Sequence, residues 1–414
     1  MIKKNNKYNK KPELLAPAGD LEKLKIAFQY GADAVYAGVP EFGMRVRQIG
    51  FDLSSLKEGI DYAHSINKKV YITVNIFAHN QDLDRLPDFL LALTKIKPDA
   101  LIVADPGVLG IINDLKINIP LHISTQANVT NWRAAEYWFD QGYERIILAR
   151  EMFWQDIAAI HKKLPVIPLE IFVHGALCMS YSGRCNISNY LTGRDANKGD
   201  CAHCCRWEYD VFLEERLRPG ELMKVEQDER GSYFFNSKDL CLIGEMDKVL
   251  ESGAMSLKIE GRNKSIYYIA TVVRAYRQAI DLASANMDKY QLEKNSLLTE
   301  LLAIDTRGYT TGFFGGENAN IAKKDGLEKE GQKKFVGLVV GRDGDFLQIQ
   351  ARNQIKLSDS LEIMSPQNVN VFKIEAFLND NRQDMGEVVN TNTVFYAKSD
   401  VDAPVNSFVR RICN

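Results

Sequence analysis

The sequence predicts an α/β protein: a (β/α)8 TIM-like barrel with a cysteine-rich insertion after the seventh strand, followed by a small all-β barrel domain. Eight short apolar runs alternate with longer stretches in which apolar residues recur at helical spacing. This series favours a closed barrel over a doubly wound open sheet, because no G-x-G-x-x-G sequence follows the first apolar run. From Phe335 onward, short alternating strands separated by Gly, Asp and Asn predict the all-β domain.

The apolar runs give the expected barrel strands in chain order. They span residues 13–19, 34–38, 70–75, 100–105, 121–126, 145–150, 169–175 and 256–262. Asp20 is the expected cap of the first helix, and Gly31 its expected stop. Further helices are expected at 54–67, 133–142, 239–253 and 263–286. A polar hairpin-like insertion is expected at 209–235, and a closing loop at the glycine-rich stretch 307–315.

Four parts are expected along the chain: a basic arm (1–11), a barrel domain (12–317), a polar linker (318–334) and a small β-barrel domain (335–412). The arm holds five lysines and no acidic residue, so it is either a phosphate-binding arm or a solvated tail. The whole chain has a net charge of −2 and 45% hydrophobic residues, an ordinary composition for a globular protein.

The sequence also bears on the compartment and the partners. It contains no apolar run long enough to cross a membrane and no signal sequence. We therefore expect a cytoplasmic protein without a membrane partner, in a reducing compartment where thiols stay free to bind metal. The sequence is compatible with a homo- or hetero-oligomer.

Five of the seven cysteines lie between residues 178 and 205, directly after the seventh expected strand. They are Cys178, Cys185, Cys201, Cys204 and Cys205. An iron–sulfur cluster needs thiolates from well-separated positions, which these offer. Structural zinc is the alternative, because Cys201 and Cys204 have zinc-like spacing. Incidental thiols are the third interpretation, whereas a disulfide is disfavoured by the odd number of cysteines and the expected compartment.

Polar residues at the ends of the expected strands predict a charged ring at one mouth of the barrel, where active sites of such barrels lie. The candidate substrate-binding residues are Arg45, Arg47, Asn75, Gln126, Arg150 and Arg262. Glu260 and Lys258 are candidate proton-transfer groups, and His174 is a further catalytic candidate. The arginines suit an anionic substrate, since guanidinium binds carboxylate or phosphate in a bidentate manner. The alternative is a purely structural role, in which several of these residues form ion pairs with each other and only position the loops.

Several motifs resemble one known family. They are L-L-A-P-A-G near the start, E-I-F-V-H-G-A-L-C-M-S-Y-S-G-R-C-N-I-S from residue 170, N-S-K-D-L at 236–240, S-L-K-I-E-G-R at 256–262 and R-G-Y-T-T-G-F-F-G at 307–315. Together with the C-terminal β domain, they cover nearly the whole chain. On these motifs, the chain resembles the U-32 peptidase family, also called collagenase-like proteases.

The resemblance is specific to family members that modify tRNA. It implies a prephenate-dependent enzyme that hydroxylates the wobble uridine in the anticodon loop of tRNA to 5-hydroxyuridine. It also implies an iron–sulfur cluster, 4Fe-4S, held by Cys178, Cys185, Cys201 and Cys205. Cys204, which adjoins Cys205, and Cys241, which follows N-S-K-D-L, are alternative fourth ligands. The small dicarboxylate prephenate would bind to some of the mouth arginines.

Two other functions remain as alternatives. A peptidase is the second hypothesis, although the chain has neither H-E-x-x-H nor G-x-S-x-G. Catalytic triads are assembled in space, so their absence from the sequence does not exclude one. A non-enzymatic RNA-binding or scaffold protein is the third and weaker hypothesis.

Overall fold

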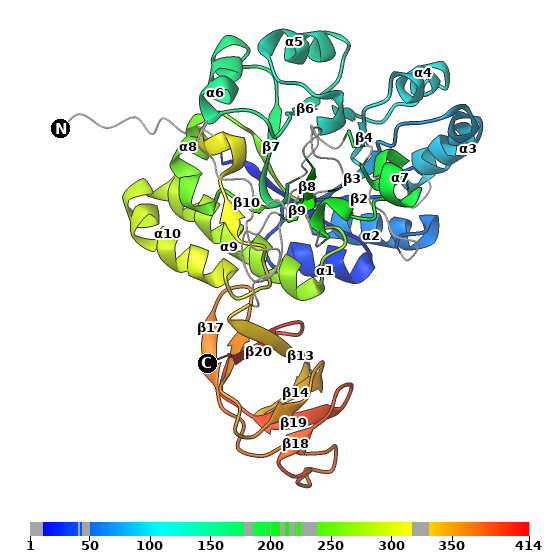
Figure 1. The fold of residues 1–414 in the computed structure, drawn as a ribbon. Helices are drawn as coiled ribbons and strands as arrows, with labels where there is room; N and C mark the ends of the chain where they lie inside the picture. The colour runs from blue at the N-terminus through cyan, green and yellow to red at the C-terminus, as the bar shows by residue number, and fades with distance from the viewer. Residues whose placement is uncertain are drawn as a thin grey trace, which may run out of the picture.

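The computed structural model describes two domains, a barrel and a C-terminal β domain (Figure 1). The described residues are 11–39, 42–43, 50–177, 184–185, 187–194, 196–198, 200–207, 212–214, 220, 222–224, 238–316 and 331–413. Residues 1–10 of the expected basic arm and most of the expected linker lie outside them. The four expected domain boundaries stay predictions.

Eight parallel strands form the barrel, as the sequence predicts. Each strand pairs with the next, and the last pairs with both the first and the seventh, which closes the ring. The strands are β1 (Glu13–Pro17), β2 (Ala34–Ala37), β3 (Lys69–Val74), β4 (Ala100–Val103), β5 (Leu121–Ile123), β6 (Arg145–Ile147), β7 (Leu169–Ala176) and β11 (Ser256–Ile259). All eight fall within or beside the expected runs, because buried parallel strands are continuously apolar.

Helices surround the barrel strands. They are α1 (Leu21–Gln29), α2 (Leu53–Ser65), α3 (Asn80–Ile96), α4 (Pro106–Asp114), α5 (Trp132–Asp140), α6 (Trp154–Lys163), α8 (Met246–Glu251), α9 (Ile266–Ala285) and α10 (Met287–Leu301). The predicted cap of α1 is confirmed, since the Asp20 carboxylate accepts a hydrogen bond from the Lys23 backbone N–H at 2.9 Å. Within the described ranges, no helix has both the length and the apolar character needed to cross a bilayer.

The prediction of a helix over residues 239–253 is wrong for the first residues of that range. Residues there form β10 (Asp239–Cys241) and a 3-10 turn, η5 (Ile243–Glu245), before α8 begins. The cause is β7, which continues beyond its pairing with β6 and β11 and offers backbone groups that need partners. β10 pairs with its last residues in antiparallel fashion, and β12 (Tyr309–Thr310) pairs with β10. The expected closing loop at 307–315 therefore contributes a strand.

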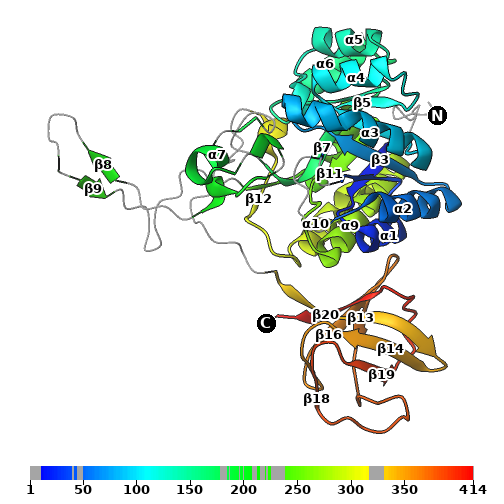
Figure 2. The same ribbon diagram turned by 90° about the vertical axis from the view of Figure 1, so that its right-hand side faces the viewer.

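The insertion between β7 and β10 contains three described pieces. They are α7 (Ile187–Thr192), two short 3-10 turns, η3 (Ala196–Lys198) and η4 (Cys204–Arg206), and an antiparallel pair, β8 (Phe212–Glu214) and β9 (Leu222–Lys224). The pair agrees with the expected hairpin-like insertion. Figure 2 shows α7 on the same side of the barrel as β12.

The C-terminal domain is an antiparallel β structure with its own apolar core, as expected. Its main sheet has the order β17-β16-β20-β13-β14-β19. Among the described residues, no pair joins the edge strands β17 and β19 as a fully closed barrel would require. The strands are β13 (Lys333–Asp343), β14 (Phe346–Ala351), β15 (Ile355–Lys356), β16 (Leu361–Met364), β17 (Val369–Phe372), β18 (Val388–Val389), β19 (Val394–Lys398) and β20 (Phe408–Ile412).

The two domains share an apolar and ionic interface. Phe408 packs against Tyr30 and Tyr267 of the barrel domain, with ring centroids 5.7 and 5.8 Å apart. Beside these rings, the fully buried Arg410 pairs with Glu300 of α10 and, at 2.5 Å, with Glu362 of β16. Because this guanidinium bridges carboxylates from both domains, it ties the C-terminal domain to the barrel.

Replacing Arg410 by methionine should cost about 3–5 kcal/mol of unfolding free energy, because it leaves two carboxylates buried without their main cation. The matched control is Arg411→Met on the same strand, whose partly exposed pair with Asp359 should contribute at most about 1 kcal/mol. Urea unfolding followed by circular dichroism measures both. Equal losses in the two variants would contradict a special role for the buried cluster.

Candidate active site at the barrel mouth

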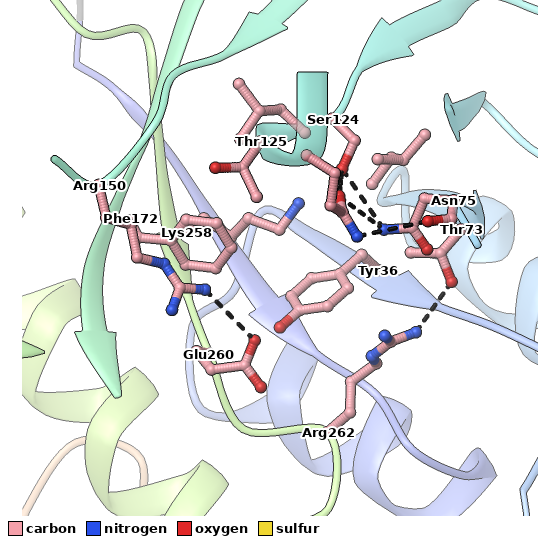
Figure 3. Close-up of a pocket in the computed structure, with 13 residues that line it drawn as sticks. Tyr36, Thr73, Asn75, Ser124, Thr125, Arg150, Phe172, Lys258, Glu260 and Arg262 are labelled. Carbon is pink, nitrogen blue, oxygen red and sulfur yellow. Dashed lines mark hydrogen bonds and ion pairs between the residues drawn. The ribbon is translucent and has the colours of Figure 1, made fainter. Parts of the chain in front are cut away.

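A pocket opens at the carboxyl ends of the barrel strands (Figure 3). Seven strands or the turns after them contribute to it, which is the usual location of active sites in this fold. It is lined by Tyr36, Thr73, Asn75, Ile102, Ser124, Thr125, Gln126, Ile147, Arg150, Phe172, Lys258, Glu260 and Arg262. Six of the nine substrate-binding and catalytic candidates from the sequence are in this group: Asn75, Gln126, Arg150, Lys258, Glu260 and Arg262.

Arg150 and Glu260 form one charged wall of the pocket. The Arg150 Nη2 atom lies 3.8 Å from Glu260 Oε2, and its Nη1 donates to the Ala176 carbonyl at 2.7 Å. The guanidinium also lies over the Phe172 ring, 3.9 Å from its centroid. A cation held by a backbone carbonyl and an aromatic face is oriented before any ligand arrives.

Arg262 forms the opposite wall, and its backbone is tightly held. Its Nη1 donates to Thr73 Oγ1 at 2.8 Å, and the residue is buried. Gly19, which follows β1, lies against the Arg262 carbonyl oxygen, where a Cβ atom would collide with it. The Tyr36 hydroxyl donates to the Ile259 carbonyl at 2.9 Å. These contacts fix the strand end that carries Glu260 and Arg262.

Amide side chains form a third wall. The Asn75 Nδ2 atom lies 3.2 Å from Gln126 Oε1, and Gln126 Nε2 lies 3.4 Å from the Asn75 carbonyl oxygen. Ser124 donates to Gln126 from the same strand end. All three residues are buried, so this wall offers neutral donors and acceptors beside the charged walls.

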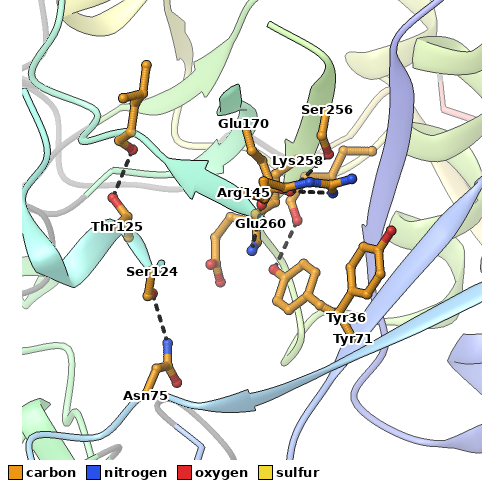
Figure 4. A network of polar contacts seen from close by, with 12 residues as sticks. Tyr36, Tyr71, Asn75, Ser124, Thr125, Arg145, Glu170, Ser256, Lys258 and Glu260 are labelled. Carbon is orange, nitrogen blue, oxygen red and sulfur yellow. Dashed lines mark hydrogen bonds and ion pairs between the residues drawn. The ribbon is translucent and has the colours of Figure 1, made fainter. Parts of the chain in front are cut away.

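Below the pocket, an ion network fills the inside of the barrel (Figure 4). The Lys258 Nζ atom lies 3.0 Å from Glu170 Oε1, and Arg145 lies 3.0 Å from the other Glu170 oxygen and 2.7 Å from Glu13. Ser256 donates to Glu170, and the Tyr71 hydroxyl donates to Glu13. Lys258 therefore connects the pocket to a buried chain of alternating charges.

The charges in this network oppose the effect of burial on pKa. Burial alone would raise the pKa of Glu170, but Lys258 and Arg145 outweigh it and hold the pKa at about 2. Burial lowers the pKa of Lys258, and the neighbouring Glu170 counteracts that effect. Lys258 Nζ also lies 4.5 Å from the centroid of the Tyr36 ring. The lysine is thus a buried cation whose charge depends on one carboxylate.

His174, a catalytic candidate, does not reach the pocket. The pairing of β7 with β11 shifts by one residue just before His174, so an extra residue reverses the side-chain alternation there. Its ring packs instead between Tyr276 and Tyr309, with centroids 5.4 Å away in each case. Burial lowers the pKa of His174 to about 4. The structure places this histidine in the core outside the barrel.

The cysteine segment, residues 178–207, is attached to the rim of the pocket. The Asn197 carbonyl accepts from the Phe77 N–H at 3.1 Å, and the Asn197 side chain bonds to both backbone groups of Cys185 at 3.0 Å. Arg184 donates to the carbonyl of Gln126 at 3.1 Å. Cys185 is therefore held near the mouth of the barrel.

The predicted cluster ligands are only partly described. Cys178 lies outside the described residues, and those described contain no group of three metal-binding side chains. The Cys201 sulfur accepts a hydrogen bond from the His203 N–H at 3.4 Å. Cys185, Cys201 and Cys205 are half-buried and form no disulfide, so the chemistry of their thiols fits an iron–sulfur centre. The complete ligand set stays a prediction.

The alternative ligands differ in their surroundings. Cys204 is buried within the segment, next to Cys205. Cys241 lies in the apolar core with its sulfur 3.8 Å from the Tyr276 hydroxyl, and burial raises its pKa to about 11. A core thiol with a raised pKa is a poor source of thiolate. Arg45 and Arg47, the remaining substrate-binding candidates, lie outside the described residues.

Sequence reasoning missed several residues of the site. Tyr36 and Phe172 face the pocket from strands that were expected to be simply apolar, and Thr73 contacts Arg262. Glu170 and Arg145 were also missed, although each is a charged residue within an expected buried strand. That signal could have found them, because charges buried in a strand require partners.

Glu170→Gln should destabilise the fold more at pH 6 than at pH 3. The folded pKa of about 2 lies below the ordinary 4.5, so this carboxylate stabilises the fold above pH 4.5 and loses that effect as the pH falls towards 2. The difference from the unsubstituted protein should shrink by about 2 kcal/mol between the two pH values. Urea titrations at both measure it, with the exposed Glu58→Gln as control. A pH-independent difference would contradict the network.

Comparison with known proteins identifies the family. A family model described as peptidase family U32 matches residues 19–324, and its C-terminal domain model matches residues 332–410. The tRNA hydroxylation protein P of Escherichia coli (strain K12) is 40% identical, over 87% of this chain and 88% of that protein. The tRNA hydroxylation protein P1 of Bacillus subtilis (strain 168) is 41% identical, over 86% and 84%. The 23S rRNA 5-hydroxycytidine C2501 synthase of Escherichia coli is 31% identical, over 87% and 54%. The chain belongs to peptidase family U32.

Proposed function

We propose that this protein is a tRNA-modifying enzyme that hydroxylates the wobble uridine to 5-hydroxyuridine, with prephenate as a co-substrate and an iron–sulfur cluster as cofactor. The observation that carries the proposal is the pocket, which combines three cations with aromatic and amide walls. The relatives named tRNA hydroxylation protein support tRNA as the substrate class.

The cations suit a small dicarboxylate. Arg150 and Arg262 come from opposite walls, and Lys258 lies between them in the pocket (Figure 3). The cavity volume is about 50 Å³, room for a few waters or one carboxylate-sized group. One carboxylate of prephenate would bind among these cations, and the rest of the molecule would extend towards the rim. Guanidinium groups provide the geometry for such an anion.

The neutral walls suit a uracil base. Phe172 and Tyr36 offer aromatic faces, and Asn75 and Gln126 offer amide groups that complement the carbonyl and N–H groups of the base edge. An enzyme that acts on a base must take it out of its stack. That cost is low in an anticodon loop, because its nucleotides are single-stranded.

Hydroxylation at C5 replaces a C–H bond with a C–O bond, which is a two-electron oxidation of the base: the C5 proton must leave to a base in the pocket, and two electrons must pass to an acceptor that the pocket residues do not supply. Glu260 is the pocket carboxylate, and its ion pair with Arg150 positions its oxygens at the pocket wall. Lys258, whose pKa burial lowers, is the second candidate for proton transfer. The cluster, held by Cys178, Cys185, Cys201 and Cys205, would supply electron transfer.

No observation in the pocket favours the peptidase alternative. Thr73, Ser124 and Thr125 are the serine and threonine residues among its lining residues, and no histidine accompanies them there. Ser124 donates to Gln126, which is not a base. A serine or threonine nucleophile needs an adjacent base to be activated. The scaffold alternative likewise gains nothing from a pocket with this many converging charges.

The decisive experiment incubates the purified, anaerobically prepared protein with tRNA and graded prephenate. Digested tRNA should contain uridine with one added oxygen atom, detected by mass spectrometry. Arg262→Ala should raise the prephenate concentration required by about 10- to 100-fold, because a charged hydrogen bond is lost. Arg133→Ala, on the exposed face of α5, is the control and should change nothing. Absence of the oxidised nucleoside at every prephenate concentration would refute the proposal.

Cys201→Ser should remove iron and sulfide from the protein and abolish hydroxylation, without changing the circular dichroism of the barrel. Cys413→Ser is the matched control, since that cysteine is exposed near the end of the C-terminal domain. Iron and sulfide analysis with a visible absorption spectrum gives the result. Full iron content in Cys201→Ser would remove this residue from the ligand set.

A further inference from the structure

Exposed aromatic side chains are concentrated at one place on the described surface. Four aromatic residues are strongly exposed among the described residues, and three of them lie in or beside the cysteine segment; Tyr190 of α7, at 88%, is the most exposed. Trp207 at the end of η4 is 46% exposed, and Phe313 in the turn η6 (Gly312–Gly315) is 38% exposed. The fourth, Tyr137, lies on the distant helix α5. Large aromatic rings left in water in one region indicate a binding surface.

Hydrogen bonds and packing hold these three residues around the pocket rim. Ser188 of α7 accepts from the Ala202 N–H at 2.9 Å, which joins α7 to the cysteine-bearing turn before Trp207. η6 packs through Gly312 against Leu177, the residue that precedes the cysteine segment. Arg184 and Asn197 tie the same segment to the pocket rim, so the exposed rings lie on parts of the chain that are joined to that rim.

The charge of the segment identifies the chemistry of its partner. Residues 184–207 contain four basic residues (Arg184, Arg194, Lys198 and Arg206) and two acidic ones (Asp195 and Asp200). This local balance is positive, whereas the whole chain carries a net charge of −2. Arg194 pairs with Asp200 at 2.7 Å, so part of this charge is balanced within the segment. Basic residues and exposed aromatic rings in one stretch of sequence are the composition that binds single-stranded nucleic acid, through phosphate contacts and stacking.

We propose that Tyr190 and Trp207 form a stacking platform for the single-stranded loop of the RNA substrate. The bases that flank the target nucleotide stack on these rings, and the target base reaches the mouth of the pocket. This inference rests on the proposed function, and it assigns loop recognition to the cysteine segment. Stacking also explains why these rings are exposed to water in the free protein. A rigid aromatic side chain loses little conformational entropy on binding, and a base stacked on the ring would bury its exposed face.

The test measures the affinity of the anaerobically purified protein for a fluorescent 17-nucleotide RNA hairpin, a length of about an anticodon stem and loop, with uridine at the target position. Tyr190→Ala and Trp207→Ala should each weaken binding by about 5- to 100-fold, the range for loss of one stacked base. Tyr190→Phe should bind like the unsubstituted protein, because stacking does not require the hydroxyl group. Tyr137→Ala is the matched control and should stay within about twofold.

Three further readouts separate the loss of base stacking from the loss of a charge contact and from damage to the cysteine segment. A hairpin with abasic sites on both sides of the target should bind the unsubstituted protein as weakly as the normal hairpin binds the alanine variants. The slope of log affinity against log salt should not change in Tyr190→Ala, since no phosphate contact is lost. Iron content should be equal in all variants, which shows that the cysteine segment is intact.

Equal binding by Tyr190→Ala, Trp207→Ala and the unsubstituted protein would overturn the proposal. So would self-association of the protein that disappears in these variants, because the rings would then bury a second copy of the chain. Binding and chemistry are measured separately. A protein that binds the hairpin through these rings but forms no 5-hydroxyuridine would refute the proposed function and leave the platform standing.

Discussion

The interior of the barrel depends on the ion pair between Glu170 and Lys258. A fully buried carboxylate is expensive unless cations compensate it, and here Lys258 and Arg145 contact its two oxygens. The same pair positions the pocket, because Lys258 extends from the buried network to the mouth. The stability of the barrel interior and the position of the Lys258 ammonium group in the pocket therefore depend on the same ion pair. A substitution of Glu170 would change both.

Above this network, close backbone contacts fix the pocket walls. Gly175 lies with φ of 104° against the Glu260 carbonyl oxygen, where a side chain would not fit. The Tyr268 hydroxyl donates to that same carbonyl at 2.9 Å. Together with Gly19 beside Arg262, these contacts make the end of β11 rigid. A rigid strand end keeps opposite charges at defined positions in a small cavity.

The sequence was sufficient for the parts of the fold that follow local patterns. Continuous apolar runs predicted the eight strands, and their polar ends predicted Asn75, Arg150 and Glu260 at the pocket. What failed depends on pairing between distant residues. A one-residue bulge in β7 turns His174 away from the mouth, and the free edge of β7 converts the expected start of a helix into β10. Neither the bulge nor the free edge is encoded by the residues nearby.

The pairing of Ala176 with Asp239 has a consequence for the history of this architecture. The insertion of roughly sixty residues between them therefore begins and ends at paired positions of the barrel domain. Its length and sequence can change without altering the closure of the barrel. Changes in the length of this insertion can then arise without any change in the strands that close the barrel.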